Sequence, residues 1–598
     1  MMLWEKWLLF VLFAALLAAT AFFCLQRYDL IVGPDDYRYV QEGMNIARGR
    51  FSEDFPLTRY FPDSPFARNR SGVPFGNAWL KDGRLYVIQP LGLPLLLALA
   101  YRLGGTSAMF LVNPILLLFL LAAQYRCARE FAGDRPGAVW MAFLSVPLLL
   151  FLPGYKLVVS SLHPSRDIPS LAFFLWAIYC LLRGVREGKG RGSGRLYSAA
   201  VFAGLACLVR ETNFILLLPA VFYLIHGVRK RLRGLLPLAL VFLLTLAPLL
   251  LENYLSFNRW VPQVSYLFEE ESPGGVGEMI AFANFLPNLF RYARWLGRLF
   301  PPPVIFLALL GFLFFGKRRE VWLLVAWPLV NLLFFSLVKF AYIRYAYPVF
   351  PAVAALAAAG ASWLVGLPWG RLGAKRWSAH ALALAGLLLA AISLSRPARG
   401  LPLQFFDLAI AMTGLALIAA DRFLPLPFRA RVFLSQPGPL AVAAALFAFV
   451  YFTAACASRA EPLRLLKRLE LARTIEEAIP EREAFLLAER NLCYTLDFHT
   501  RFTALSPDKL STFSGLDLND AIAALQTRGV PVYFLDNKGK SDGRRRLPYL
   551  AERFTLSPVL RLNSPDLAIW RKNLAEQAVV TIYRIGESRP ISSEPPPP

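Results

Sequence analysis

The stretch LLPLALVFLLTLAPLLL, at residues 235–251, has no charged side chain and decides the fold class of this chain. A helix needs roughly 20 mostly apolar residues to cross a bilayer, and similar blocks recur at 7–25 and 107–123. Of the 598 residues, 57% are hydrophobic and 17% are charged, whereas a soluble domain is about 45–50% apolar and about 25% charged. We predict a mainly α-helical, polytopic transmembrane protein.

The apolar blocks alternate with short polar loops, which predicts about 13 spans. We place them at roughly 5–25, 107–124, 137–156, 168–183, 196–209, 212–227, 235–254, 302–316, 321–338, 347–366, 379–395, 405–420 and 438–457. Lys and Arg gather in every second loop, and such loops face the cytoplasm. This predicts a cytoplasmic N-terminus and an extracytoplasmic C-terminus, in a bacterial inner or plasma membrane.

The formal net charge of +24 arises largely in these loops. Basic loops set membrane orientation and attract anionic lipid. The charge therefore indicates the lipid bilayer as a partner, and we expect no nucleic acid partner.

Residues 1–457 are predicted to form the transmembrane domain, with long extracytoplasmic loops at 26–106 and 255–301. The apolar run 91–103 is short, contains Pro94 and precedes Gly104-Gly105, so we expect an interfacial helix along the membrane. The stretch 196–227 carries Arg210-Glu211 at its middle. We predict a helical hairpin there, with its turn at the outer surface.

Residues 458–598 have a different composition and are predicted to form an extracytoplasmic C-terminal α/β domain. Helix-like stretches at 462–478 and 518–528 alternate with strand-like runs at 484–487, 531–535 and 578–583. The final Pro-rich residues are typical of disorder.

Acidic side chains lie at two predicted outer loops. Asp35 and Asp36 follow the first span, and Asp167 directly precedes another. Adjacent carboxylates repel each other, so one of them can have a raised pKa and act as a base. The structural alternatives are that Pro34-Asp35-Asp36 begins a surface helix and that Asp167 is an N-cap. His163, four residues before Asp167, is by itself an ordinary loop residue.

Basic side chains lie on the same predicted side. Arg210-Glu211 separates two apolar runs, and such residues face a cavity or each other; an internal salt bridge is the structural alternative. Lys339, Arg344 and Tyr345 lie in a short outer loop with interleaved aromatics, where snorkelling anchors are the alternative. Acids and cations on one rim suit a reaction that releases a phosphate from a lipid, because the cations would hold the phosphate.

Several short motifs occur in an order that resembles the GT-C superfamily of integral membrane glycosyltransferases. The similarity is greatest to the branch with lipid A aminoarabinose transferase and protein O-mannosyltransferases. The motifs are Pro34-Asp35-Asp36-Tyr37-Arg38-Tyr39, Gln89-Pro90-Leu91-Gly92, Asp167-Ile168-Pro169, Leu208-Val209-Arg210-Glu211 and Arg344-Tyr345-Ala346-Tyr347-Pro348. They cover roughly residues 1–370. Gln89 replaces a common Lys of the family, and Arg210-Glu211 replaces Lys-Gly.

This resemblance implies inverting transfer of a sugar from a polyprenyl-phosphate donor to a lipid, glycan or protein acceptor at the outer face. It implies that Asp35 is the base or orients the acceptor, that Asp36 and Asp167 support it, and that Arg210 and Arg344 stabilise the leaving phosphate. The expected substrate-binding residues are Arg38, Tyr39, Gln89, His163, Arg166, Arg210, Glu211, Lys339, Arg344 and Tyr345.

Some members use a divalent metal with paired acids, but no third acidic ligand stands at a clear spacing here. We therefore assign no cofactor, and a divalent metal stays open. A transporter or flippase of a lipid-linked glycan is the alternative function. It would need polar residues along a path through the bilayer, whereas blocks such as 382–394 are almost wholly apolar.

Overall fold

The computed structural model describes three stretches of the chain, 34–257, 280–366 and 461–588. Short gaps inside them lie at 55–56, 63, 65–70, 76–77, 82–83, 88, 134–137, 152–155, 189–190, 228–234, 301, 317, 489–492, 494–495, 499, 538–540 and 565–577. The spans predicted at 5–25, 379–395, 405–420 and 438–457, and the Pro-rich end, lie outside the described residues.

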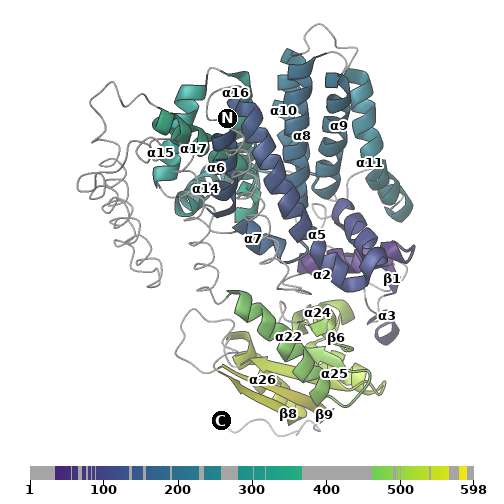
Figure 1. Cartoon of the computed structure of the whole chain (residues 1–598). Coiled ribbons are helices and arrows are strands. Elements are labelled where there is room, and N and C mark those ends of the chain that lie inside the picture. Colours follow the sequence, from purple (N-terminus) through teal and green to yellow (C-terminus); the bar gives the residue numbers. More distant parts are fainter. Residues whose placement is uncertain are drawn as a thin grey trace, which may run out of the picture.

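Apolar helices packed side by side form one half of the molecule (Figure 1). They are α5 (Gly92–Ala132), α6 (Ala138–Phe151), α8 (Asp167–Glu187), α9 (Arg191–Val209), α10 (Asn213–Gly227), α11 (Leu235–Phe257), α15 (Pro302–Phe315), α16 (Arg319–Leu337) and α17 (Val349–Gly366). Within the described ranges, four helices are long and apolar enough to cross a membrane, namely α5, α8, α11 and α16, and shorter apolar helices pack beside them.

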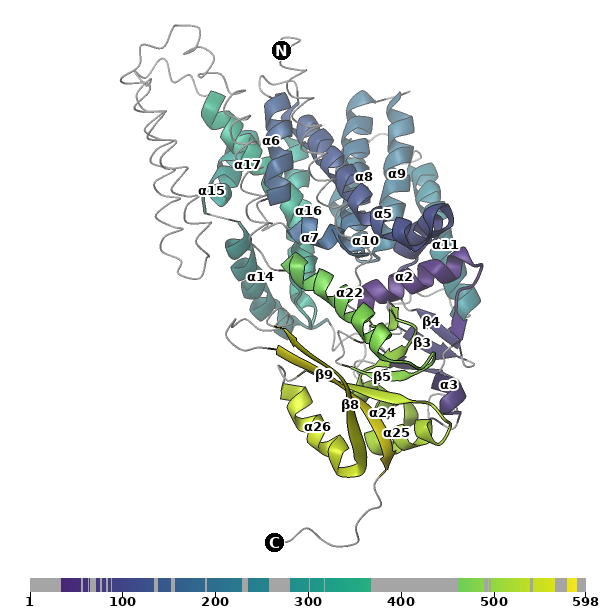
Figure 2. The same ribbon diagram turned by 60° about the horizontal axis from the view of Figure 1, so that its bottom comes forward.

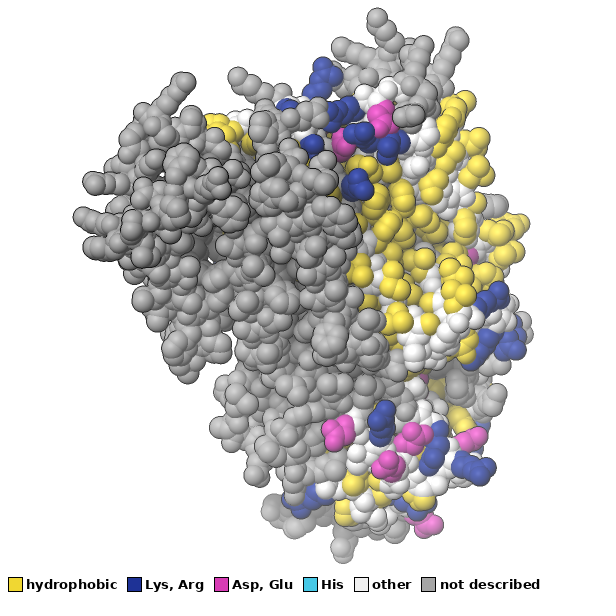
Figure 3. Space-filling view, viewed as in Figure 1, with side chains coloured by type: hydrophobic (Ala, Val, Ile, Leu, Met, Phe, Trp, Pro, Cys, Tyr) yellow, Lys and Arg dark blue, Asp and Glu magenta, His cyan; other side chains and the backbone are white. Residues whose placement is uncertain are grey.

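The outer surface of these helices is itself apolar. Phe222 and Leu236 are 74% and 76% exposed, which would be costly in water but is favourable in lipid. Figure 3 shows hydrophobic side chains gathered over the helices on this face, with Lys and Arg near one end. Together with the candidate spans, this surface makes the chain an integral membrane protein.

Helix α5 has 41 residues, about twice the length that one span requires. The backbone is non-helical at Gly104 and Gly105, and Gly105 has a φ of 68°, a left-handed conformation that glycine adopts without strain. The break separates the predicted interfacial run 91–103 from the predicted span 107–124. The predicted hairpin is also present, as α9 and α10 joined by a turn at residues 210–212.

The first long loop contains α2 (Pro34–Ala47), α3 (Leu57–Tyr60) and a small sheet that the sequence analysis did not predict. Its antiparallel strands lie in the order β1-β4-β3-β2, with bounds Glu53–Asp54, Arg84–Val87, Ala78–Lys81 and Ser71–Phe75. Strands this short carry little period-2 pattern, so they are hard to recognise in a sequence.

Four further short elements connect the spans. They are α7 (Lys156–Ser161), η2 (Phe282–Asn284), α14 (Phe285–Leu299) and η3 (Ile343–Ala346).

The C-terminal part combines helices with a five-stranded sheet of order β6-β5-β7-β9-β8. Strands β6 (Thr503–Leu505), β5 (Phe485–Leu487) and β7 (Val532–Asn537) are parallel, and β9 (Ala578–Ser588) and β8 (Phe554–Ser564) add antiparallel. The helices are α22 (Glu461–Ala478), α24 (Pro507–Ser514), α25 (Leu518–Gln526) and α26 (Ser541–Arg553). Strands occupy all three runs predicted as strands.

This C-terminal domain packs against the first long loop (Figure 2). The Tyr37 hydroxyl of α2 donates a hydrogen bond to Asp497. The Phe110 and Phe498 rings pack edge-on with their centroids 6.2 Å apart, and the Phe61 and Phe513 rings pack in the same way at 6.4 Å. Helix α2 therefore lies between the membrane helices and the C-terminal domain.

Gly92 brings the start of α5 against the end of α9. A β-carbon on Gly92 would lie 2.6 Å from the backbone nitrogen of Val209 and 2.7 Å from the carbonyl carbon of Leu208. Only glycine permits such a close approach of two backbones. The contact fixes the segment after Gln89 against the turn that carries Arg210.

We predict that Gly92→Ala lowers the thermal denaturation midpoint, because the added methyl group must push the α5 and α9 backbones apart. The matched control is Gly194→Ala in α9, where no atom lies within 4 Å of the added carbon. The control should be neutral or slightly stabilising, since Ala favours helix over Gly. Equal midpoints for both variants in detergent would contradict the proposed contact.

Candidate active site

Charged and polar residues from five distant segments meet at one end of the membrane helices. The segments are the start of α2, the residues before α5, the loop before α8, the turn between α9 and α10, and η3. Salt bridges of Glu130, Arg183 and Glu187 mark the opposite end of α5 and α8. The 21 residues of α8 are about 30 Å long, so the polar cluster lies about one membrane thickness from those pairs.

Helix α2 begins at Pro34, and its first turn presents two aspartates. Asp35 Oδ2 accepts a hydrogen bond from Arg344 Nη1 at 2.9 Å. Asp36 Oδ1 lies 3.1 Å from His163 Nδ1. The two aspartates therefore begin a helix and also belong to the site, because both carboxylates reach cations from other segments.

Asp167 and Arg210 form the most buried ion pair of the cluster. Arg210 Nη1 donates to Asp167 Oδ1 at 2.7 Å, and their side chains are only 6% and 9% exposed. The N-cap residue of α8 is Arg166, and it makes no side-chain cap hydrogen bond. The alternative role of Asp167 as an N-cap is therefore wrong, because its carboxylate satisfies a buried guanidinium instead.

Tyr345 lies against both site arginines. The guanidinium carbon of Arg210 is 5.2 Å from the Tyr345 ring centroid, and that of Arg344 is 5.9 Å away. Arg344 also lies 5.2 Å from the Tyr342 ring. Aromatic faces attract cations at these distances, so the ring holds the two guanidinium groups near each other.

Gln89 joins α2 to the loop before α8. Its Oε1 accepts hydrogen bonds from the Tyr39 hydroxyl at 2.7 Å and from Arg166 Nη1 at 3.4 Å. The amide thus occupies a position between a buried phenol and a cation. Burial raises the pKa of Tyr39, so its hydroxyl remains a hydrogen-bond donor.

The aspartates set the charge of the basic groups. Burial by itself would lower the pKa of Arg344, but Asp167 and Asp35 outweigh it and raise that pKa. Burial likewise opposes the charge of His163, and the charge and hydrogen bond of Asp36 raise its pKa overall. The aspartates therefore favour the charged forms of Arg344 and His163. Burial lowers the pKa of Arg210, and the charge of Asp167 opposes that effect.

Two of the cations have buried N–H groups that find no hydrogen-bond partner among the described residues, namely Nη2 of Arg210 and Nε of Arg344. A buried donor that makes no hydrogen bond is costly. An oxyanion placed between these guanidinium groups would satisfy both donors.

Glu211 differs from the aspartates. Both of its carboxylate oxygens are buried and make no hydrogen bond with the part of the chain that the structure describes. Burial raises the pKa of Glu211 to about 7, against the opposing charge of Arg166. The expected alternative of an Arg210–Glu211 salt bridge is wrong, since Arg210 pairs with Asp167.

Two predicted residues take other positions. Lys339 is exposed, and the structure shows no hydrogen bond or ion pair between it and the described residues of the cluster. Arg38 donates to Gln41 at 3.0 Å, stacks on Tyr37 at 5.2 Å, and its charge acts on Asp497. Arg38 thus contributes to the contact with the C-terminal domain.

Several residues that the sequence analysis missed hold the site loops in place. Asn113 Nδ2 donates to the carbonyl oxygens of His163 at 2.7 Å and Ser165 at 2.8 Å. The Ser160 and Tyr347 hydroxyls lie 3.1 Å apart and tie α7 to the segment after Arg344. A lone Asn inside the apolar block 107–123 was a usable signal.

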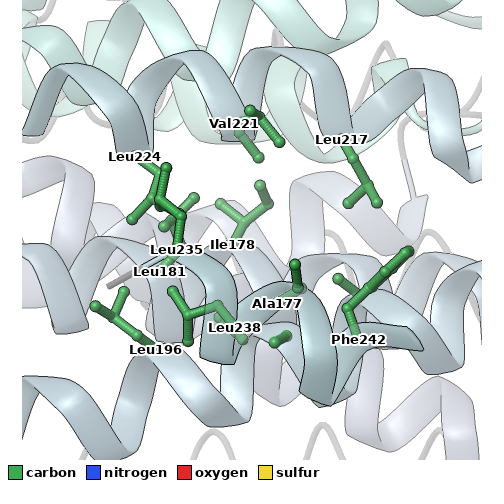
Figure 4. Close-up of a pocket in the computed structure, with 15 residues that line it drawn as sticks. Ala177, Ile178, Leu181, Leu196, Leu217, Val221, Leu224, Leu235, Leu238 and Phe242 are labelled. Carbon is green, nitrogen blue, oxygen red and sulfur yellow. The ribbon is translucent and has the colours of Figure 1, made fainter. Parts of the chain in front are cut away.

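A separate apolar cavity lies within the membrane part, between α8, α9, α10 and α11 (Figure 4). Its volume is ≈ 300 Å³, and Ile178, Leu217 and Phe242 line it. Ile178 is roughly 15 Å along α8 from Asp167 at about 1.5 Å per residue. The cavity is therefore distinct from the polar cluster.

The carboxylates of the cluster are spread over several partners. Across the described ranges, no group of three or more His, Cys, Asp and Glu residues is arranged to hold a metal ion. Asp35, Asp36 and Asp167 face three different cations, so they do not converge on one shared point.

Known structures resemble this arrangement over nearly the whole chain. ArnT from Cupriavidus metallidurans bound to undecaprenyl phosphate matches with a TM-score of 0.58 and 18% identity, covering 96% of this chain and 98% of that one. Its apo form matches with a TM-score of 0.58 and 16% identity, covering 97% and 98%. The chain therefore shares its fold with these two structures.

Other comparisons cover less of this chain or are weaker. The family of dolichyl-phosphate-mannose-protein mannosyltransferases matches residues 88–251, which include Gln89, Asp167 and Arg210. The apo oligosaccharyltransferase of Archaeoglobus fulgidus aligns with a TM-score of 0.44 and 14% identity, over 88% of this chain and 69% of that one. No curated protein matches the sequence.

We predict that Asp167→Asn destabilises the protein far more than Asp35→Asn. Breaking a buried ion pair strands the other charge and costs about 3–5 kcal/mol. The Asp35–Arg344 pair is more exposed, at 24% and 35%, where a pair contributes about 1 kcal/mol or less. Thermal denaturation in detergent measures the difference. Equal losses would contradict the special role of Asp167.

We also predict that His163 titrates at a higher pH than an ordinary histidine, because Asp36 stabilises its charged form. The resulting stability is present at low pH and is lost as the pH rises through the raised pKa. Nuclear magnetic resonance can follow the titration, since the chain has only 4 histidines and His163→Asn assigns the signal. Asp36→Asn should lower this pKa, and an unchanged pKa would contradict the pairing.

Proposed function

We propose that the protein is a glycosyltransferase that moves a hexosyl or pentosyl group from a polyprenyl-phosphate donor to a lipid, glycan or protein acceptor. The observation that carries the proposal is the pair of buried N–H groups without partners, Arg210 Nη2 and Arg344 Nε. They lie at the membrane surface, where the phosphate of a lipid carrier would arrive. Fixed guanidinium donors suit a phosphate oxyanion.

The similarity to ArnT bound to undecaprenyl phosphate supports a lipid phosphate as the bound group. We place the reaction, together with the C-terminal domain, on the extracytoplasmic side. This sidedness rests on the basic loops of the sequence. The contact of α2 with both halves of the molecule supports a shared side for the site and that domain.

Each step of the proposed reaction uses residues of the cluster. The acceptor oxygen attacks the anomeric carbon, and the bond from that carbon to the phosphate oxygen breaks with its electron pair on the phosphate. Arg210 and Arg344 stabilise the charge on this leaving group. Asp35 orients the acceptor and takes its proton. A single displacement of this kind inverts the anomeric centre.

The remaining groups position these participants. Asp36 holds His163, and Asp167 holds Arg210. Tyr345 lies against both arginines. Gln89 links Tyr39 to Arg166, which adds a third cation beside the proposed phosphate position. Fixing the groups before the substrate arrives lowers the cost of reorganisation during the reaction.

Sugar transfer by the purified protein in nanodiscs tests the proposal with a panel of polyprenyl-phosphate sugars. We predict donor consumption by the wild type and a loss of about 100-fold or more in Asp35→Asn and Arg344→Ala. Arg48→Ala is the matched control, because Arg48 lies at the other end of α2 against Tyr101 and outside the cluster. It should retain activity.

The outcomes separate the competing interpretations. Full activity in Asp35→Asn would keep the enzyme class and refute the role of Asp35. A wild type that consumes no donor in the panel and binds none would refute the transferase. Transport of a lipid-linked glycan across the bilayer by that same protein would establish the alternative function.

A further inference from the structure

Glu211 is the carboxylate of the site that protein groups leave unsatisfied. Asp35, Asp36 and Asp167 each contact a cation at 2.7–3.1 Å. Both oxygens of Glu211 are buried and accept no hydrogen bond from any residue in the described stretches 34–257, 280–366 and 461–588. A buried carboxylate without hydrogen bonds is among the costliest arrangements in a protein, so its persistence points to a ligand that supplies donors.

The turn that carries Glu211 is held firmly. Asn213 Nδ2 donates to Ser170 Oγ at 2.8 Å and to the Ala206 carbonyl oxygen at 2.7 Å. The backbone nitrogens of Asn213 and Phe214 donate to the carbonyl oxygens of Arg210 and Glu211 at 3.0 Å each. Because the backbone is fixed on both sides, Glu211 does not depend on a loose loop for its position.

Arg166 locates Glu211 relative to the proposed phosphate position. The charges of Asp35, Asp167 and Arg344 all act on Arg166. Arg166 is in turn the charged group that acts on Glu211. Glu211 also follows Arg210 directly in the turn between α9 and α10. A sugar attached to a phosphate among the arginines can therefore extend toward it.

We propose that Glu211 binds hydroxyl groups of the sugar that is transferred and thereby selects the donor. This inference rests on the proposed glycosyltransferase function and adds the recognition of the sugar to it. A carboxylate has two oxygens that accept hydrogen bonds, and neighbouring hydroxyls of a sugar ring offer two donors at matching spacing. The guanidinium groups recognise the phosphate, which every donor of this class shares, whereas Glu211 contacts the part that differs between donors.

The chemistry of the two halves of the donor explains this division. A phosphate carries negative charge and is repelled by a carboxylate, so Glu211 belongs beside the neutral ring. A site that pairs a buried acceptor with a substrate hydroxyl strongly rejects analogues that lack the hydroxyl, because the acceptor is then left unsatisfied. Glu211 is accordingly a binding residue, and the reaction steps above do not use it.

The test compares binding of two lipids to the full-length protein in nanodiscs. One is a polyprenyl-phosphate sugar that the wild type consumes, and the other is the same polyprenyl phosphate without the sugar. We expect Glu211→Gln and Glu211→Ala to weaken binding of the sugar-bearing lipid on the order of 10- to 100-fold. Binding of the bare lipid phosphate should be unchanged in both variants.

The matched control is Glu252→Gln, which changes another buried glutamate, near the end of α11 and outside the cluster. It should bind both lipids like the wild type. Glu211→Gln removes a buried charge, so its thermal denaturation midpoint should not fall, and folding is checked by that midpoint. Equal weakening of both lipids in the Glu211 variants would overturn the proposal, as would no weakening of either.

A set of donors that each lack one ring hydroxyl identifies the contact. One of these donors lacks the hydroxyl that Glu211 binds, and the wild type should bind it more weakly than the complete donor. Glu211→Ala should bind this deoxy donor and the complete donor with equal affinity, because the contact is already absent. If removing each hydroxyl weakens binding to Glu211→Ala as much as it weakens binding to the wild type, the proposed sugar contact is wrong. If the Glu211 variants keep their turnover and their sugar preference, the role of Glu211 is refuted and the transferase function stands. If the wild type binds neither lipid, both the role of Glu211 and the transferase function are refuted.

Discussion

The buried ion pair between Asp167 and Arg210 is the constraint on which the rest of the site depends. It joins the first turn of α8 to the turn between α9 and α10, with a separation of 2.7 Å. At the edge of a membrane, water is scarce, so neither charge can be left alone without a large cost. From Arg210, contacts continue through Tyr345 to Arg344 and on to Asp35. Segments far apart in the chain are therefore placed by a single series of charge contacts.

Helix α2 links this charge cluster at the membrane helices to the C-terminal domain. Residues four apart lie on one face of a helix, and Asp35 and Tyr39 face the arginines and Gln89. Tyr37 lies between them in sequence and points to the other side, where it donates to Asp497. Helix α2 is short and has little apolar character, so its position depends on contacts with both the charge cluster and the C-terminal domain. The C-terminal domain is thus part of what holds the proposed base in place.

The unsatisfied hydrogen-bonding groups indicate which ligand the site can bind. Donors on Arg210 and Arg344 and acceptors on Glu211 are already buried, so the cost of removing them from water has been met during folding. A phosphate and a sugar joined to each other would satisfy the donors and the acceptors at once. The apolar cavity among α8–α11 lies deeper in the membrane and takes no part in this polar recognition.

The sequence by itself determined the class of the protein and much of its local structure. Apolar blocks of sufficient length must be helices, because lipid leaves backbone groups no other partner, and the hairpin at 196–227 and the break at Gly104-Gly105 follow from local residues. The acids and cations of the rim were also visible, as was their similarity to GT-C motifs. Only the tertiary structure decided which charges pair. Asp167 is not the N-cap, Lys339 stands outside the cluster, and Glu211 makes no hydrogen bond within the described residues. Pairing depends on which helix ends meet in space, and local sequence carries no record of those distances.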